Sequence, residues 1–251
     1  MNILAIGNSF SEDATRYLHG IANADGQPCS VANLCIGGCS LDRHYRNMLS
    51  GKNAYELQYN GNNTGFYVSL GDALLNREWD VITLQQASHQ SFTTQSYLPY
   101  ISELAAYARK CSPRAKIYIH QTWAYEADSS RLLNIAKYPT PEAMLSDVVK
   151  AYEAAAQAIQ ADGVIPSGEL FAKLLENGVE GIHRDTFHAS LGVGRYALGL
   201  LWYSTLYKRS VARNGFCDLD AYVSPETLCT VKQCVDSFLK KGDESCKVQI
   251  P

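Results

Sequence analysis

The sequence lacks any apolar run that approaches the roughly 18 residues of a membrane-spanning helix. It also shows no basic region and apolar leader ahead of its first apolar run, because Met1 leads directly into that run. This predicts a cytoplasmic protein, or an exported one if a leader was removed upstream. Positive charge is not concentrated either. A net charge of −3 is spread along the chain, which argues against nucleic acid as the main partner.

The eight cysteines include no Cys-x-x-Cys pair, which disfavours a zinc ribbon or a thioredoxin-like site. Cys35 and Cys39 flank two glycines and could hold a metal together with His44. We interpret them instead as small, partly buried thiols that line a tight turn, and we expect no metal. Four cysteines near the C-terminus could form one or two disulfides if the protein is exported: Cys217, Cys229, Cys234 and Cys246.

Length and composition predict one α/β domain. The chain has 251 residues, 46% of them hydrophobic, which suffices for one substantial core but not for two ordinary domains. We place the domain over residues 1–251, with a core at about 2–210 and a C-terminal helical extension at about 211–251.

Five short apolar runs alternate with stretches of helical periodicity, which is typical of a parallel sheet covered by helices on both faces. This order predicts an α/β fold of three layers, a flavodoxin-like α/β/α sandwich around a central, mostly parallel five-stranded sheet. The runs are Ile3–Ile6, Val31–Leu34, Val81–Leu84, Lys116–His120 and Gly163–Ile165.

The clearest helix follows Thr140 and Pro141, a capping residue and a proline at the first helical position, and it ends by Gly163. Its apolar stripe is expected to lie on the sheet. The segment 191–207 is apolar nearly all round, so we expect it to be buried. Further helical stretches are predicted at residues 66–77, 97–110 and 225–239.

Two insertions interrupt this order. Residues 55–69 alternate in polarity around Asn60-Gly61, which predicts a β-hairpin. Residues 122–140 form a polar stretch with aromatic side chains after the fourth strand. Because ligands of open α/β sheets bind beyond the carboxyl ends of the strands, this stretch is placed to act as a lid.

Two short motifs at opposite ends of the chain supply the residue types of a nucleophilic site. The first apolar run breaks into Gly7-Asn8-Ser9-Phe10-Ser11, and Asp185-Thr186-Phe187-His188 lies near the other end. A serine needs a histidine to take its proton, and the histidine needs an acid to fix its tautomer. We therefore predict Ser9 as nucleophile, His188 as base and Asp185 as its orienting acid. His183 is the alternative base, but the spacing of three favours His188.

These motifs resemble the first and last blocks of the SGNH hydrolases, the GDSL-like lipases and esterases. Cys35-Ile36-Gly37-Gly38-Cys39 is similar to the second block, in which a glycine gives a backbone N–H to the oxyanion hole. The resemblance implies that Gly38, chosen over Gly37, acts with the N–H of Ser9. Four blocks in order, over roughly residues 2–207, look like a bacterial branch of this superfamily.

The chain departs from the superfamily pattern in two places. The third strand is usually followed by Gly-x-Asn-Asp, whose asparagine is a side-chain oxyanion donor, whereas this chain has Gln85 and Gln86. We expect Gln86, or alternatively Gln85, to replace that donor. The second departure is Asn8, where the superfamily usually has Asp.

The resemblance implies a serine esterase that needs no cofactor. Its expected substrate is a small acyl ester, such as an acetyl group on a carbohydrate, because the predicted lid is polar and aromatic. His89 is expected to line the pocket, and Trp123 and Tyr125 to offer a stacking surface for a sugar ring. The oligomeric state cannot be predicted.

Three other interpretations are open. A lipase, phospholipase or thioesterase of the same superfamily would use the same residues. A non-catalytic glycan-binding module would use the pocket without the chemistry, and the two glutamines favour it. A flavodoxin-like protein that binds a phosphate-bearing cofactor is disfavoured, because the first turn lacks a glycine-rich phosphate loop.

Overall fold

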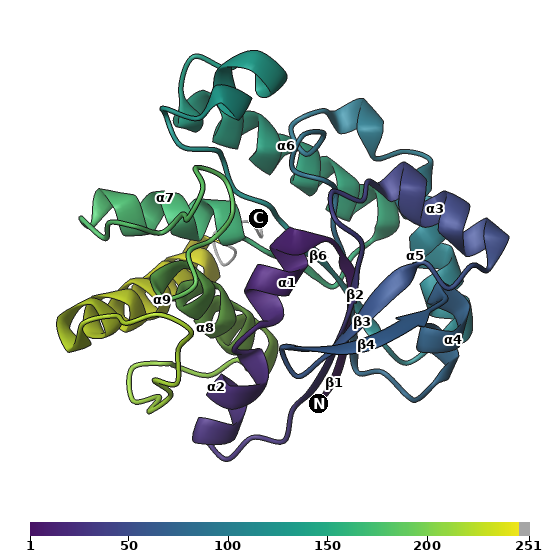
Figure 1. The fold of residues 1–251 in the computed structure, drawn as a ribbon, viewed down its shortest axis with the longest axis horizontal. Coiled ribbons are helices and arrows are strands. Elements are labelled where there is room, and N and C mark those ends of the chain that lie inside the picture. Colours follow the sequence, from purple (N-terminus) through teal and green to yellow (C-terminus); the bar gives the residue numbers. More distant parts are fainter. Residues whose placement is uncertain (246–251) are drawn as a thin grey trace.

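The computed structural model describes the backbone of residues 1–245 and the side chains of residues 1–239. It shows a twisted sheet between two layers of helices (Figure 1). The seven strands lie in the order β4-β3-β2-β1-β5-β6-β7. They are β1 (Asn2–Gly7), β2 (Ser30–Cys35), β3 (Tyr55–Tyr59), β4 (Asn62–Val68), β5 (Val81–Leu84), β6 (Lys116–His120) and β7 (Gly163–Ile165).

The five predicted parallel strands are confirmed, and β1 is the central strand of the seven. It pairs in parallel with β2 on one side, where Ile3 lies opposite Val31, and with β5 on the other. The strands β5, β6 and β7 continue the parallel part of the sheet. Parallel strands buried on both faces read as continuous apolar runs, which is why the sequence located them.

The sheet has seven strands and not five, because the predicted hairpin extends it. β3 pairs antiparallel with β2, and β4 pairs antiparallel with β3. The connecting residues Asn60 and Gly61 have φ values of 49° and 80°, the left-handed conformation of a tight hairpin turn. A Cβ on Gly61 would lie 2.1 Å from the carbonyl oxygen of Arg16, so this position requires glycine. The sheet is therefore mixed.

Helices cover both faces of the sheet. One layer holds α1, α2 and α8, with α9 packed on its outer side, and the other holds α3, α4, α5 and α6 (Figure 1). α7 packs against α6, α8 and α9. The helices are α1 (Ser9–Thr15), α2 (Leu18–Ala24), α3 (Leu41–Ser50), α4 (Leu70–Leu75), α5 (Tyr100–Cys111), α6 (Pro141–Ile159), α7 (Ser167–Glu176), α8 (Val193–Tyr207) and α9 (Pro225–Ser245), with a 3-10 turn at Thr94–Ser96 and a π-helical turn at Leu132–Ala136.

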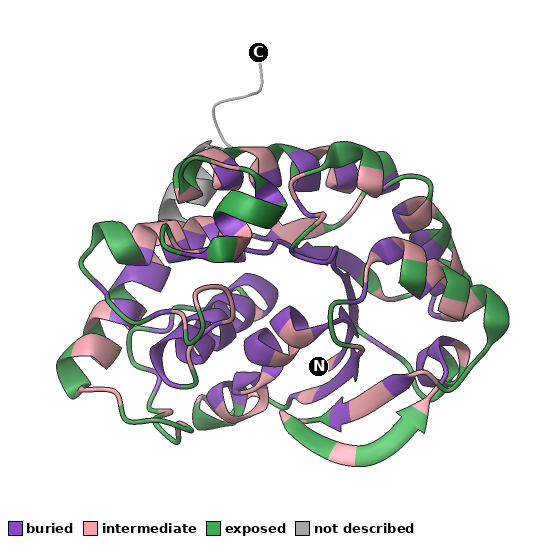
Figure 2. Cartoon of the chain, turned by 45° about the horizontal axis from the view of Figure 1, so that its top comes forward, coloured by how far each residue is buried: buried purple, intermediate pink, exposed green. Residues whose placement is uncertain are grey.

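The predicted helices are present, with shifted ends. α6 begins after Thr140, whose hydroxyl accepts a hydrogen bond from the N–H of Ala143. α8 is buried over all but its last residue, as its apolar composition indicated (Figure 2). Its glycines permit close packing, since a Cβ on Gly199 would lie 2.7 Å from Ile21 of α2. None of the described helices combines the length and apolar character that crossing a membrane requires.

Candidate active site

The candidate residues gather where the parallel strands end. Ser9 follows β1 and is the first residue of α1. Gly38 follows β2, and Gln85 follows β5 directly. Since β1, β2 and β5 are neighbours and run in parallel, their carboxyl ends meet at one edge of the sheet. This is the edge at which open α/β sheets bind their ligands.

The hydroxyl of Ser9 lies against the imidazole of His188. Ser9 Oγ is 2.8 Å from His188 Nε2, and His188 Nδ1 is 2.7 Å from Asp185 Oδ2. A carboxylate only accepts hydrogen bonds, so Nδ1 carries the proton and Nε2 presents its lone pair to the hydroxyl. In this arrangement the histidine can withdraw a proton from the serine.

Asp185 is held by its own turn. Its Oδ1 accepts hydrogen bonds from the backbone N–H of His188 at 2.8 Å and of Phe187 at 3.4 Å. Partial burial raises the pKa of Asp185, but the bonds from the His188 ring and from these two amides outweigh it, so the pKa lies below its usual value. The carboxylate is therefore ionised at neutral pH and keeps the ring of His188 in one orientation.

His183, the alternative base, is engaged elsewhere. Its Nδ1 is 3.1 Å from Glu126 Oε1, and its side chain is only 3% exposed. Burial lowers the pKa of His183, and the charge of Glu126 opposes that shift. The backbone of His183 forms an isolated bridge with Ala189 that closes the loop around the turn of His188. The structure thus places His188, and not His183, beside Ser9, while His183 helps to hold the loop of His188 in shape.

Thr186, inside this turn, has a left-handed backbone with φ of 66°. Such a conformation is strained for a β-branched residue and persists only where contacts hold it. The carbonyl of Thr186 accepts from the N–H of Glu126 at 2.9 Å, and its hydroxyl donates to Ser129 Oγ at 2.9 Å. Both partners belong to residues 122–140, so this segment packs on the turn that carries His188. Its opening as a lid stays a prediction.

A buried carboxylate connects the two halves of the site. Asp13, one helical turn after Ser9 on α1, is fully buried. It accepts from the guanidinium of Arg184 at 2.9 Å, from Nε of Arg195 at 2.8 Å and from the N–H of Ala189 at 3.1 Å. Burial raises the pKa of Asp13, and the two arginines oppose the shift. Because Arg184 and Ala189 flank the turn of His188, these bonds fix that turn against the helix of Ser9.

Neither Asp13 nor Arg184 was identified from the sequence. Polar residues in a short helix and in a loop are ordinarily solvated, so their burial could not be expected. The available signal is the spacing of Asp13, four residues after Ser9, which places both on one face of α1.

Gly38 is exposed beside the serine turn. Its φ of 60° is left-handed, which favours glycine, and a Cβ there would meet open space. Within the part of the chain that the structure describes, its N–H donates no hydrogen bond. The loop of Gly38 is attached to the first strand by a bond of 3.4 Å from the N–H of Ile36 to the carbonyl of Gly7. The N–H of Gly38 is therefore available to a ligand.

Gln86 does not present its amide to a ligand. It is fully buried, and its Nε2 donates to the carbonyl and hydroxyl of Ser96, each at 3.0 Å. Its Oε1 accepts from the N–H groups of Leu41 and Ala87 at 3.0 and 2.8 Å. With both amide hydrogens engaged, Gln86 connects three loops, and the expectation that it supplies an oxyanion donor is corrected.

Gln85 lies behind the serine turn and not in front of it. It is fully buried, and its Nε2 is 3.4 Å from Oδ1 of Asn8. A Cβ on Gly7 would lie 2.5 Å from Gln85 Oε1, so the absence of a side chain at Gly7 makes room for this amide. Gln85 therefore contacts the turn that carries Ser9 from inside the protein, and its expected role as a donor to the oxyanion is also revised.

The predicted stacking surface for a sugar is not exposed. Trp123 is fully buried, with its ring stacked at 4.2 Å on Phe10 of α1 and its Nε1 donating to the carbonyl of Phe187. Tyr125 is 1% exposed. Both rings lie inside the protein and Trp123 supports the turn of Phe187 and His188, so the role expected of them as an exposed stacking surface is corrected. His89 is exposed, and its part in substrate binding stays a prediction.

The cysteines near Gly38 lie in a turn without the arrangement of a metal site. Cys39 Sγ is 3.5 Å from Nδ1 of His44, while Cys35 Sγ is 3.7 Å from a carboxylate oxygen of Glu12. Burial raises the pKa of both thiols, that of Cys39 to about 12, which opposes the thiolate that metal binding needs. Over the described residues, no three His, Cys, Asp or Glu side chains are grouped to hold a metal ion.

The C-terminal cysteines are free thiols as far as the structure describes them. This holds for Cys217, Cys229 and Cys234, and Cys246 lies outside the described residues.

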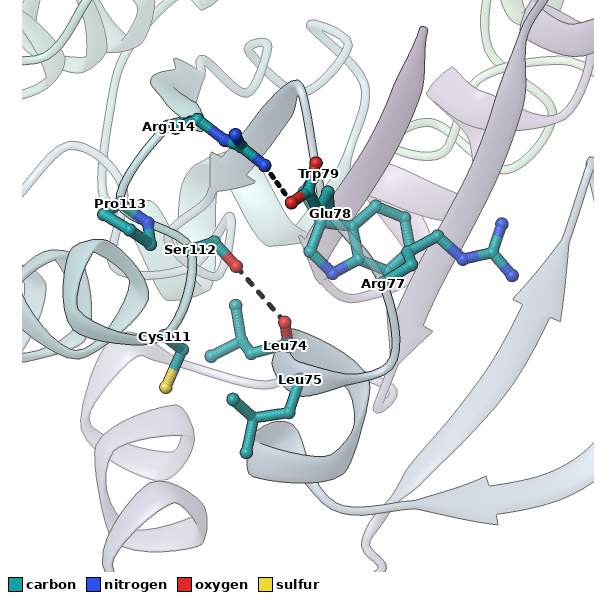
Figure 3. A pocket seen from close by; sticks show the side chains of 9 residues that line it. All are labelled: Leu74, Leu75, Arg77, Glu78, Trp79, Cys111, Ser112, Pro113 and Arg114. Atoms are coloured by element: carbon teal, nitrogen blue, oxygen red, sulfur yellow. Dashed lines mark hydrogen bonds and ion pairs between the residues drawn. The ribbon is translucent and has the colours of Figure 1, made fainter.

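A hollow of about 510 Å³ lies where β5 and β6 begin, at the opposite edge of the sheet from Ser9. Figure 3 shows Arg114 turned toward Glu78 across it, and the hydroxyl of Ser112 bonded to the carbonyl of Leu74. None of the candidate catalytic residues lines this hollow.

An apolar cavity of about 440 Å³ lies closer to the candidate residues, between α6, α7 and residues 124–127. Its walls include Tyr125, Phe171 and His183, so it borders the loop that carries His188.

Comparison with solved structures defines the class of fold. A protein from Slackia heliotrinireducens that is classed with the SGNH hydrolases is 22% identical, with a TM-score of 0.61 over 82% of this chain and 98% of that one. The acetylxylan esterase Axe2 from Geobacillus stearothermophilus is 12% identical, with a TM-score of 0.50 over 86% of this chain and 94% of that one. The chain has the α/β fold of the SGNH, or GDSL-like, hydrolases, as its motifs predicted.

Two further comparisons define a family, which is a smaller group than the proteins that share this fold. The family described as Domain of unknown function (DUF4886) matches residues 2–230. A crystal structure of a DUF4886 family protein from Bacteroides uniformis is 30% identical, with a TM-score of 0.89 over 97% of this chain and 96% of that one. The chain belongs to the DUF4886 family. No curated protein matches it.

Proposed function

We propose that this protein is a serine esterase that hydrolyses a small acyl ester, with an acetyl group on a carbohydrate as the favoured substrate. The observation that carries the proposal is the unbroken set of contacts from the carboxylate of Asp185, through the ring of His188, to the hydroxyl of Ser9. The fold shared with an acetylxylan esterase supports the choice of substrate.

In the proposed acylation, Ser9 Oγ attacks the ester carbonyl carbon while Nε2 of His188 takes the hydroxyl proton. The carbonyl oxygen becomes an oxyanion, which the backbone N–H groups of Ser9 and Gly38 stabilise. Collapse of this intermediate expels the alcohol, which receives the proton from His188, and leaves an acyl-serine. Asp185 stabilises the imidazolium that forms in between.

Deacylation repeats these steps with water. His188 removes a proton from water, the hydroxide adds to the acyl carbon, and the proton returns to Ser9 as the acid leaves. The nucleophile, the base, its orienting acid and the two oxyanion donors of this proposed cycle are all residues of this chain.

A longer acyl chain is the second candidate substrate. The apolar cavity of about 440 Å³ beside His183 is large enough for part of a hydrocarbon chain, which favours a lipase or thioesterase of the same mechanism.

The test is hydrolysis of p-nitrophenyl esters of acetate, butyrate and octanoate by the purified protein, beside Ser9→Ala and with acetylated xylan as a polymer. We expect turnover that falls with acyl length and is lost in Ser9→Ala. Turnover that rises with acyl length would favour the second candidate. Activity that persists in Ser9→Ala would contradict the mechanism, and glycan binding without turnover would indicate a non-catalytic module.

A further inference from the structure

Asn8, the residue before the proposed nucleophile, bridges two turns of the site. It is 1% exposed. Its Oδ1 accepts from the N–H of Phe10 at 3.0 Å, and its Nδ2 donates to the carbonyl of Cys39 at 3.1 Å. The orientation of the amide is settled by its neighbours, because a backbone N–H requires an acceptor and a backbone carbonyl requires a donor.

The carbonyl that Asn8 holds belongs to the turn of Gly38. Cys39 closes this turn with a bond of 3.0 Å from its N–H to the carbonyl of Ile36, and Gly38 is the third of the four residues in it. At the other end of the turn, the N–H of Ile36 donates to Gly7. Gly7 and Asn8, the two residues just before Ser9, therefore each hold one end of the Gly38 turn.

Gln85 supports this bridge from the protein interior. Its Nε2 lies 3.4 Å from the same Oδ1 of Asn8 that caps α1. A second donor on this oxygen disfavours rotation of the amide and keeps Nδ2 aimed at Cys39. Thus Gln85, which follows β5, acts on the site only through its contact with Asn8.

We infer that Asn8 is the residue that positions the oxyanion hole, by fixing the N–H of Gly38 relative to the N–H of Ser9, with Gln85 behind it. The inference rests on the proposed esterase function. An aspartate could cap α1 equally well, but it could not donate to the Cys39 carbonyl, so the Gly38 turn would lose its bond to the residue before Ser9.

The chain offers a matched control in Asn214. This residue is 2% exposed, its Oδ1 accepts from the N–H of Phe216 at 3.1 Å, and its Nδ2 donates to the carbonyl of Ile21 at 2.9 Å. It makes the same two kinds of bond as Asn8, but between α2 and the residues after α8. Asn8→Asp and Asn214→Asp therefore lose one equivalent buried hydrogen bond each, and only one of them touches the site.

The experiment compares kcat and KM of the two variants and the wild type on p-nitrophenyl acetate, with inhibition by phenylboronic acid as a mimic of the tetrahedral intermediate. We expect Asn8→Asp to lower kcat about 100-fold, the scale of a misplaced oxyanion donor, with KM within about threefold. Inhibition by the boronic acid should weaken in parallel. Asn214→Asp should keep wild-type kcat, although both variants melt at lower temperature.

The possible results distinguish a failure of the positioning role of Asn8 from a failure of the proposed esterase function. A wild type without ester hydrolysis would overturn the proposed function itself. An active wild type whose kcat is unchanged in Asn8→Asp, or lowered equally in Asn214→Asp, would overturn the positioning role alone. If Asn8→Asp does not fold, Asn8→Ser decides, because serine caps the helix but is too short to reach Cys39. We expect it also to lose kcat, and wild-type kcat there would overturn the inference.

Discussion

The carboxylate of Asp13 lies 2.9 Å from the guanidinium of Arg184 and 3.1 Å from the N–H of Ala189, and so joins the helix of Ser9 to the loop of His188. The two catalytic candidates come from distant parts of the sequence, and their separation of 2.8 Å depends on how α1 packs against that loop. The buried carboxylate of Asp13 fixes this packing, because a buried charge must keep its hydrogen-bond partners, and two of them flank His188.

Asp13→Asn is expected to lower the free energy of unfolding by about 3–5 kcal/mol, because it leaves Arg184 without a carboxylate partner and removes a fully buried charge that Arg195 also pairs with. Urea denaturation measures this. The neighbouring variant Glu12→Gln is the control, since its carboxylate is partly exposed and 3.9 Å from Arg195, and it should cost less than about 1 kcal/mol. Equal losses in both variants would contradict the structural role of Asp13.

Ser9→Ala and His188→Gln should each abolish ester hydrolysis, whereas His183→Gln should retain most of it. The reason is geometric, because His188 contacts the serine and His183 contacts Glu126. Initial rates on p-nitrophenyl acetate test this, with circular dichroism as a check of folding. Loss of activity in a folded His183→Gln and its survival in His188→Gln would reverse the assignment of the base.

Asp185→Asn should lower kcat by about 10³- to 10⁴-fold, because the amide can donate to Nδ1 and so favour the wrong tautomer of His188. The pKa of Asp185 lies below its usual value, so the carboxylate contributes fully at neutral pH and is lost only as the pH falls through that lowered pKa. A pH profile of kcat should therefore show no loss from Asp185 between pH 6 and pH 8. A variant that keeps more than about a tenth of wild-type kcat would argue against this role.

Asp220 should make stability depend on acid pH. Its carboxylate accepts from Arg16 at 2.6 and 2.7 Å and from Arg195 at 3.1 Å, and the bonds with Arg16 lower its pKa to about 2. A lowered pKa in the folded state stabilises the protein above the unfolded value of about 4, and this contribution is lost as the pH falls toward about 2.

Asp220→Asn should therefore reduce the free energy of unfolding by about 1–2 kcal/mol at pH 6 and by about half as much at pH 3. Urea titrations of both proteins at the two pH values measure the difference. A deficit that does not shrink in acid would mean that the variant acts through packing and not through charge.

The parallel part of the fold was predictable because its strands are buried on both faces. Ile3 and Val31 lie opposite each other inside continuous apolar runs, which are typical of parallel strands that are covered on both faces. The number of strands was less predictable. The hairpin was evident from Asn60-Gly61, but nothing in residues 55–69 indicates which strand it joins, since that pairing is a long-range contact with β2.

The candidate site was predictable at positions where the chemistry needs a particular residue type. It was less predictable at positions where the role of a residue depends on whether its side chain is buried. Ser9, Asp185 and His188 were candidates because nucleophilic chemistry needs those residue types, and the structure places them in hydrogen-bonding contact. Trp123 and Gln86 were misjudged because sequence position alone does not distinguish a residue that faces a ligand from one that packs beneath it.

At Thr186, the strain of a left-handed backbone opposes the contacts that hold the turn of His188 in place. A glycine there would relieve the strain of about 1 kcal/mol that a side chain incurs in this conformation. It would also release the hydroxyl contact with Ser129 and allow the turn beside His188 to sample other shapes. Replacement of Thr186 by glycine to raise stability would therefore loosen the turn that holds His188 beside Ser9, and under the proposed esterase function it would slow turnover.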